Sequence, residues 1–264
     1  MIVIKGAGDL ASGVAVRLAH CGFAIVMTDL PHPTSIRRTV CFSEAILNGS
    51  FTVEDVSAEY AASYEMIPAI HTRGHIAVVV DPNADCIKAL LPEVVVDAIL
   101  AKRNLGTKIT DAPVVIALGP GFTAGVDCHA VIETMRGHDL GRVIQTGAAE
   151  PNTGIPGNIS GFTTERVLRA PKDGTFREIR HIGDIVVKND PVAQIDEEMI
   201  LAPLSGVIRG LLPSGTPVHA GMKSGDIDPR PVQSHCFTVS DKARAIGGGV
   251  LEAILMLQRR NTNV

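Results

Sequence analysis

Five short apolar runs constrain this chain most, because no polar residue interrupts any of them. They lie at 2–4, 24–28, 76–80, 94–96 and 114–118, and each is followed closely by Gly or Asp. Strands that are apolar throughout are typical of a parallel sheet covered by helices on both faces. Helical spacing of apolar residues from Leu10 to His20 joins the first two runs. The sequence therefore predicts an α/β fold with a Rossmann-like doubly wound parallel sheet.

Glycines and polar residues follow these runs, at the edge where doubly wound sheets bind ligands. Gly6-x-Gly8-x-x-Ala11 has the spacing of a dinucleotide-binding turn, and Asp29 stands where an acidic residue contacts the ribose. The alternative is a sheet that keeps this turn without binding a dinucleotide, and Asp9 is an awkward anionic neighbour for a phosphate. The predicted cofactor-binding residues are Gly6, Gly8, Asp9, Leu10, Ala11, Asp29, Asp97, Lys102, Asn104, Gly119 and Gly121.

Two charged segments offer further candidates. Lys102 and its neighbours suit a phosphate or carboxylate ligand, or else form an exposed basic helix end. Strands at 129–134 and 142–146 predict a hairpin whose loop carries Arg136, His138 and Asp139 as candidate catalytic residues. The alternative for that loop is a charged turn, because turns are usually polar.

An internal repeat marks the second half of the chain. Ala170-Pro171-x-x-Gly174 recurs 32 residues later as Ala202-Pro203-x-x-Gly206. Two similar halves of short strands predict a smaller all-β module of barrel-sandwich type, resembling biotinyl and lipoyl carrier domains. Those carriers modify a Lys between the halves, and the stretch 196–200 here contains no Lys. We therefore expect no covalent biotin or lipoate.

A helix is predicted near the C-terminus, with Ser240 as its N-cap. Gly247-Gly248-Gly249 interrupts its apolar stripe, so either the helix breaks there or another backbone approaches closely. The expected domains are 1–165 for the nucleotide-binding part with its hairpin, 166–232 for the β module and 233–264 for the C-terminal helix.

Composition excludes several classes of function. With 24 basic and 28 acidic residues and 3% aromatic residues, the chain lacks the basic, aromatic surface of a nucleic-acid binder. The five cysteines contain no CxxC, which argues against a disulfide framework, and we expect no metal site. No apolar run is long enough for a membrane helix and the N-terminus has no signal-peptide pattern, so a cytoplasmic location is expected.

Several long stretches together resemble one family. They include KGAGDLASGVAVRL, VIALGPGFTAGVD, HAVIETMRGHDLGRVI and SDKARAIGGGVLEAIL. These stretches are similar to the YqeB-type proteins of the selenium-dependent molybdenum hydroxylase system, through nearly the whole chain. The start of the chain also resembles the Rossmann part of XdhC-type accessory proteins.

This resemblance implies an accessory or maturation protein for a selenium-dependent molybdenum hydroxylase. It would bind a nucleotide or the molybdenum cofactor at the sheet edge. Its partners would be the client hydroxylase or other maturation factors, and a homo-oligomer is compatible with the sequence. The alternative is an NAD(P)-dependent oxidoreductase acting on a small molecule, with His138 or the Lys102 and Asn104 pair as proton donor.

Overall fold

The computed structural model describes residues 1–262, which form two compact units. Unit 1 comprises 1–33, 41–153 and the described residues from Val239 onward. Unit 2 comprises 34–40 and 154–238. This division differs from the expected domains 1–165, 166–232 and 233–264. The C-terminal helix belongs to unit 1, and the short segment 34–40 joins unit 2.

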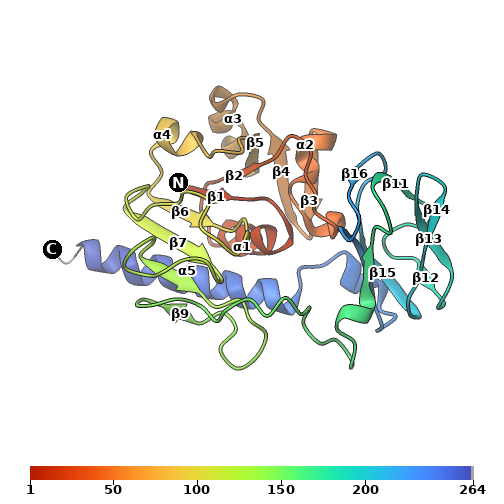
Figure 1. Ribbon diagram of the computed structural model, residues 1–264. Helices are drawn as coiled ribbons and strands as arrows, with labels where there is room; N and C mark the ends of the chain where they lie inside the picture. The colour runs from red at the N-terminus through yellow and green to blue at the C-terminus, as the bar shows by residue number, and fades with distance from the viewer. Residues whose placement is uncertain (263–264) are drawn as a thin grey trace. The chain divides into compact units, whose positions relative to one another are not determined.

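Unit 1 is built on a nine-stranded mixed sheet (Figure 1). The strand order is β3-β4-β5-β2-β1-β6-β7-β8-β9. All neighbours from β4 to β8 run parallel, whereas β3 and β9 pair antiparallel at the two ends. The strands are β1 (Ile2–Lys5), β2 (Ile25–Asp29), β3 (Ser50–Val53), β4 (Val56–Tyr60), β5 (Ile76–Val80), β6 (Val94–Asp97), β7 (Val114–Leu118), β8 (Ala130–Ile132) and β9 (Val143–Ile144).

The predicted fold class is wrong as stated. A doubly wound parallel sheet does not describe a sheet that carries an antiparallel hairpin at each edge. The physical reason lies partly in residues 50–60, where buried Val53, Val56 and Ala58 are interspersed with more exposed residues. That pattern suits an edge hairpin with one covered face rather than a strand buried on both faces. The barrel-sandwich-like module is likewise replaced by two separate antiparallel sheets.

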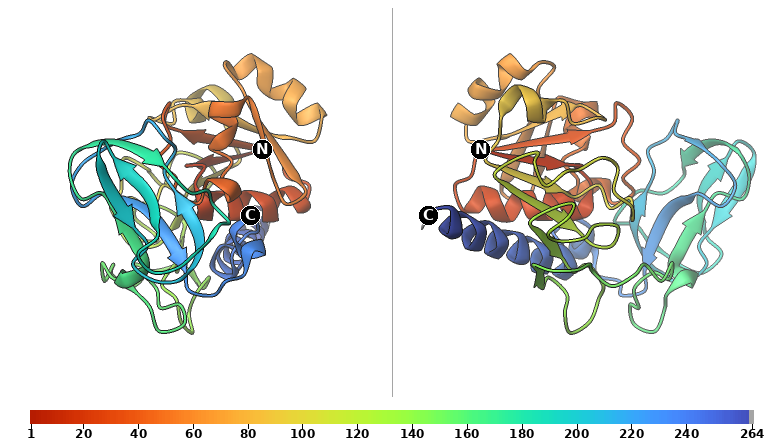
Figure 2. Two further views of the ribbon diagram at one scale, coloured as in Figure 1. Left: turned by 90° about the vertical axis from the view of Figure 1, so that its right-hand side faces the viewer. Right: turned by 60° about the vertical axis from the view of Figure 1, so that its left-hand side comes forward.

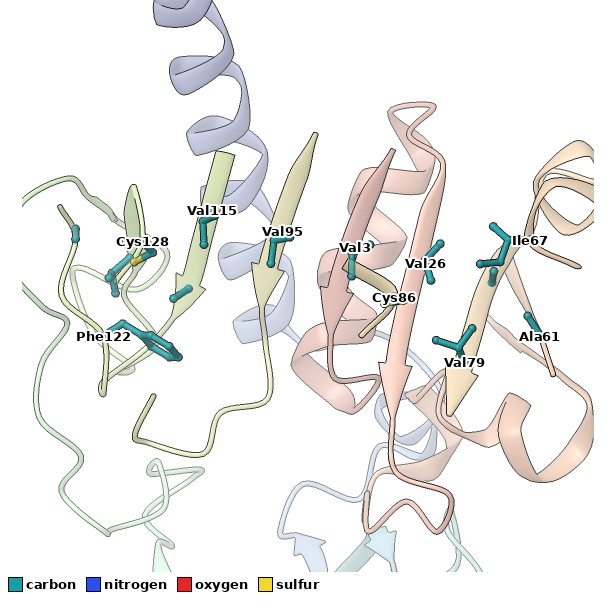
Figure 3. Close-up of a cluster of buried hydrophobic side chains, with 14 of the residues drawn as sticks. Val3, Val26, Ala61, Ile67, Val79, Cys86, Val95, Val115, Phe122 and Cys128 are labelled. Atoms are coloured by element: carbon teal, nitrogen blue, oxygen red, sulfur yellow. The ribbon is translucent and has the colours of Figure 1, made fainter. Parts of the chain in front are cut away.

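One face of the large sheet carries a continuous apolar layer. Figure 3 shows Val115, Val95, Val3, Val26 and Val79 aligned across successive strands. Short helices and loops cover this layer, including Cys86 from α4 and Phe122 from the loop after β7. The helices of unit 1 are α1 (Asp9–His20), α2 (Glu44–Asn48), α3 (Ile67–Thr72), α4 (Cys86–Leu90) and α5 (Asp241–Thr262), with a 3₁₀ turn at Tyr64–Met66.

Helices α1 and α5 lie side by side, as both views of Figure 2 show. Glycines permit this contact. A Cβ added at Gly13 would lie 2.5 Å from the Ala243 Cβ, and one added at Gly249 would overlap the Gly141 carbonyl oxygen. At Gly247 the nearest backbone atom, the Gly13 oxygen, would be 3.2 Å away. Of the two alternatives for the glycine triplet, the structure therefore shows close backbone approach, and the helix continues through it.

Unit 2 reproduces the sequence repeat as two four-stranded antiparallel sheets. Their orders, β10-β17-β15-β12 and β14-β13-β11-β16, correspond strand by strand at the 32-residue offset. The strands are β10 (Val167–Arg169), β11 (Gly174–Glu178), β12 (Ile185–Val186), β13 (Pro191–Ile195), β14 (Glu198–Leu201), β15 (Gly206–Leu211), β16 (Pro217–Val218) and β17 (Lys223–Asp228), and 3₁₀ turns lie at Arg38–Val40, Thr164–Arg166 and Gln233–Cys236. Asp226 forms a buried ion pair with Arg166, and buried Asp228 pairs with the more exposed Arg230.

Among the described residues, no helix combines the length and apolar character needed to cross a membrane.

The packing of α5 against the hairpin that contains Gly141 predicts opposite effects for two neighbouring glycines. We expect Gly249→Ala to destabilise the protein by roughly 1–3 kcal/mol, because its methyl group would overlap the Gly141 backbone. A Cβ added at Gly248 would meet no atom within 4 Å, so Gly248→Ala should stabilise the helix by up to about 1 kcal/mol. Urea unfolding of the two variants measures both. Equal effects at the two positions would contradict this packing.

Candidate functional site

The candidate site lies at the carboxyl edge of the parallel strands of unit 1. Gly6 follows β1 there, Gly8 is the N-cap of α1, and Asp9, Leu10 and Ala11 form its first turn. The ends of β6 and β7 bring the 97–107 and 119–121 segments to the same edge. The structure thus brings together the predicted cofactor-binding residues of the central strands.

The Asp29 carboxylate holds the glycine turn itself. One oxygen accepts a hydrogen bond from the Ala7 amide at 3.0 Å, and the other accepts one from the Leu30 amide at 2.8 Å. Burial raises the pKa of Asp29, and these two backbone bonds counteract the rise. The acidic residue that the sequence assigned to a ribose is therefore used to shape the turn.

Two of the predicted glycines allow loops to pack on one another. A Cβ at Gly121 would lie 2.6 Å from backbone atoms of Arg103, and one at Gly119 would lie 2.5 Å from the Thr134 hydroxyl. Gly6 similarly approaches the Ala98 carbonyl. Since each close neighbour belongs to the protein, these glycines position the loops of the edge.

A buried charged network lies between the ends of β1 and β6. Lys5 and Asp97 are register partners, and the Lys5 ammonium lies 3.2 Å from the Asp97 carboxylate. The Lys5 ammonium also donates to the Thr107 hydroxyl at 2.5 Å, and that hydroxyl donates to Asp97 at 2.5 Å. All three residues are at most 5% exposed. Burial of a charge is tolerated when it is paired and hydrogen-bonded, as it is here.

This network closes the loop that carries Lys102. The Asn104 side chain completes it by donating to the Thr107 carbonyl and the Asp127 carboxylate and by accepting from the Thr107 amide. Asn104 therefore organises the loop. Lys102 has a left-handed backbone (φ 62°) and an exposed side chain. A non-glycine residue in that conformation is held by its surroundings.

The candidate catalytic loop divides into two parts. Arg136 forms a bidentate pair with Asp241 at the start of α5, with distances of 2.6 and 2.9 Å. His138 is exposed, and exposed Asp139 pairs with Arg142 at 2.7 Å. Only Arg136 of the three candidates therefore lies against the element that completes the edge, and His138 and Asp139 stay on the hairpin surface.

Lys242 lies in the first turn of α5 and is half-buried. Burial lowers the pKa of its ammonium, and the positive charges of Arg136 and Lys102 lower that pKa further. The carboxylates of Asp9 and Glu133 oppose the shift. The charges that affect the pKa of Lys242 therefore come from the first turn of α1, the loop after β6 and the segment after β8.

Glu133 is fixed in this field by backbone hydrogen bonds. Its two carboxylate oxygens accept from the Met135 amide at 2.7 Å and from the Glu150 amide at 2.8 Å. The side chain is 3% exposed. A carboxylate held in this way gives the site a fixed negative charge beside its cations.

Other chemistries find less support in the described residues. Cys41, Cys86, Cys128 and Cys236 are buried, and burial raises the pKa of Cys128 to about 12, which disfavours a thiolate nucleophile. Within residues 1–262, no three His, Cys, Asp or Glu side chains gather as ligands for a metal ion.

Sequence reasoning missed Lys5, Thr107 and Lys242. A signal for Lys5 was present, since it is the one charged residue in the first apolar strand and directly precedes the glycine turn. Lys242 had no comparable signal. Its position depends on the packing of α5 against α1, which no local pattern reveals.

Comparison with known proteins gives one strong sequence match. No family model matches the chain. It is 55% identical over 260 residues to a protein of Escherichia coli (strain K12) named only "Uncharacterized protein YqeB". The match covers 98% of this chain and 48% of that protein, so the chain spans about half the length of this curated relative. The relative's name states no activity and mentions neither selenium nor molybdenum.

Solved structures give weak matches. An aspartoacylase family protein from Mesorhizobium loti aligns over 88% of this chain and 85% of its own, at 14% identity and a TM-score of 0.31. A succinylglutamate desuccinylase from Silicibacter aligns over 86% and 84%, at 12% identity and a TM-score of 0.26. These TM-scores are too low to transfer a fold family or an activity to this chain.

These findings correct the predicted function. The solved structures that the chain resembles are aspartoacylase or desuccinylase proteins by name, and the name of the Escherichia coli relative gives no activity. The Asp29 carboxylate, predicted to contact a ribose, holds the glycine turn itself. The accessory role in hydroxylase maturation and the alternative oxidoreductase are therefore not retained as functions of this chain.

The buried network predicts graded losses of stability. Asp97→Asn leaves the Lys5 ammonium buried beside a neutral group, so we expect a loss of roughly 3–5 kcal/mol. Thr107→Val removes only the bridging hydroxyl and should cost about 1–3 kcal/mol. Denaturant unfolding measures both losses. A smaller loss in Asp97→Asn than in Thr107→Val would show that the ion pair is not the main contact.

The Lys242 charge predicts a stability effect that depends on pH. Because folding lowers its pKa, the ammonium costs stability at every pH below the folded-state pKa, and this cost disappears as the pH rises to 10.5. We expect Lys242→Met to be at least as stable as the wild-type chain at pH 7, with the difference shrinking toward pH 10.5. Exposed Lys188 in unit 2 provides the matched control Lys188→Met. A variant clearly less stable than wild type at pH 7 would show that Lys242 forms net favourable ion pairs.

Proposed function

We propose that unit 1 binds a small anionic ligand, with a carboxylate or phosphate group, at the carboxyl edge of its sheet. The observation that supports this most is that Arg136 pairs with Asp241, the residue directly before half-buried Lys242, and that the positive charges of Arg136 and Lys102 contribute to lowering the pKa of Lys242. Cations that crowd one another destabilise the unliganded protein, and an anion among them relieves the repulsion. A ligand of opposite charge is therefore the natural occupant.

The first turn of α1 adds to this preference. The amides at a helix N-terminus have no partner within the helix and, with the helix dipole, favour negative charge. Gly8 and Asp9 begin this helix, and Asp9 is among the charges that act on Lys242. Asp9 and Glu133 limit the net positive charge, which favours a small anion with one or two charges over a polyanion.

A cytoplasmic location also belongs to this proposal. It is supported by the five cysteines, which form no disulfide among the described residues.

The proposal predicts stabilisation of the full chain by simple anions. We expect inorganic phosphate or succinate to raise Tm, and the rise should fall with added NaCl because the site is partly exposed. At about 100 times the dissociation constant the gain is about 2.7 kcal/mol. Differential scanning fluorimetry measures the shift, which should be lost in Lys242→Met and kept in Lys188→Met. Equal shifts in all three proteins would place the anion elsewhere and overturn the proposal.

A further inference from the structure

Strand β14 is the least protected edge among the strands described in unit 2. Of the other edge strands, β16 contains Pro217, which has no amide to donate, β10 contains Arg169, and β12 has only two residues. β14 has four residues and contains neither proline nor a basic residue (Figure 1). Its one charged residue, Glu198, stands at its start. Proteins protect strand edges with proline, basic residues or short length, because an unprotected edge pairs readily with another strand.

The two sequence repeats differ at this edge. At the 32-residue offset, Met199 and Leu201 of β14 correspond to Val167 and Arg169 of β10. Val167 is 9% exposed, and the Arg169 guanidinium donates to the Gly221 carbonyl at 2.8 Å. Met199 and Leu201 are 52% and 48% exposed. The second repeat therefore presents two large apolar side chains to solvent where the first has one buried side chain and one hydrogen-bonded polar side chain.

The backbone of β14 directs alternate residues toward β13 and toward the edge. Ala202 exchanges backbone hydrogen bonds of 2.8 Å with residues 189–190, directly before β13. Two residues earlier, Ile200 therefore also directs its amide and carbonyl toward β13. Met199 and Leu201 direct theirs toward the edge. In the described part of the chain β14 pairs only with β13, so these backbone groups face no other strand.

We infer that two copies of this chain pair through β14, antiparallel, about a two-fold axis at Ile200. In this register Met199 lies opposite Leu201 of the partner subunit, and Leu201 lies opposite the partner's Met199. Both residues have edge-directed backbone groups, so each opposite pair exchanges amide–carbonyl hydrogen bonds. Opposite residues project to the same face of a sheet, so the four exposed apolar side chains come together. The inference concerns unit 2 and is independent of anion binding in unit 1.

The charges and the size of the strand determine what kind of dimer is expected. Glu198 would lie opposite Ala202 of the partner subunit, so this register brings no two carboxylates together. Exposed Pro191, the register partner of Leu201 in β13, extends the apolar surface beside the new pair. A short strand buries less than the roughly 800 Å² per partner of a stable interface. We therefore expect a reversible dimer with a Kd in the micromolar range or weaker.

Sedimentation equilibrium of the full chain from about 1 to about 300 µM tests the dimer, and we expect reversible self-association. Leu201→Lys should weaken it at least about tenfold, because the ammonium would face an apolar Met199 side chain. Ile185→Lys is the matched control and should keep the dimer, since Ile185 is 51% exposed on β12, an edge of the other sheet. Circular dichroism checks the fold of both variants, and Met199→Lys replaces Leu201→Lys if that variant misfolds.

Three results of this experiment would overturn the inference. A monomer at every concentration would leave β14 available for an extended peptide of another protein instead of a second copy. A dimer that persists unchanged in Leu201→Lys, or one that is weakened equally in Ile185→Lys, would place the interface elsewhere.

Disulfide trapping tests the register. Met199→Cys and Leu201→Cys are each made together with Cys21→Ser, which removes the one exposed cysteine of the described chain. Opposite residues of a strand pair lie at a Cα separation that a disulfide can span. An equimolar mixture of the two variants should therefore oxidise to a dimer linked between positions 199 and 201, identified by peptide mapping. Either variant alone should form a linked dimer several times more slowly. Equally fast linkage in one variant alone would overturn the two-fold axis at Ile200.

Discussion

The contact between α1 and α5 is the constraint on which the candidate site depends. Gly13 and Gly247 have no side chains, and this lets the backbones of α1 and α5 approach closely. The contact packs α5 against α1. Without it, Asp241 and Lys242 would have no fixed relation to the sheet edge. A packing requirement in the middle of α5 thereby determines the position of a charged group at its start.

Lys5 and Lys242 differ in how far their surroundings compensate their positive charge. Lys5 is almost fully buried, but its charge is matched by Asp97 and bridged by Thr107, so it serves structure. Lys242 is less buried, but the groups near it include the cation of Arg136, so its charge is only partly compensated. Burial is the main reason that the pKa of Lys242 is lowered, and the nearby positive charges of Arg136 and Lys102 add to that effect.

Much of the framework could be predicted from the sequence, because its signals are local. The apolar runs became strands, and Ser240 caps α5 as expected. The sequence predicted the hairpin of β8 and β9, but not the hairpin of β3 and β4 or the joining of both hairpins to the parallel sheet, since that depends on how short edge strands pair. The site was predicted by position more than by role. Asp97 lies at the expected edge, yet its partner Lys5 is far from it in sequence and adjacent only through strand order. Long-range pairing of this kind leaves no pattern in a single sequence.

The cost of the Lys242 charge links stability to function. A protein gains nothing in its free state from an ammonium that is desolvated and crowded by cations, and an apolar side chain there would remove that cost. In the proposed function, a bound anion would offset the repulsion of the Lys242 ammonium by the charges of Arg136 and Lys102. In the unliganded protein, the negative charges of Asp9 and Glu133 partly offset the repulsion of Lys242 by Arg136 and Lys102. In the proposed site, the ligand therefore supplies negative charge that the protein itself does not provide beside Lys242.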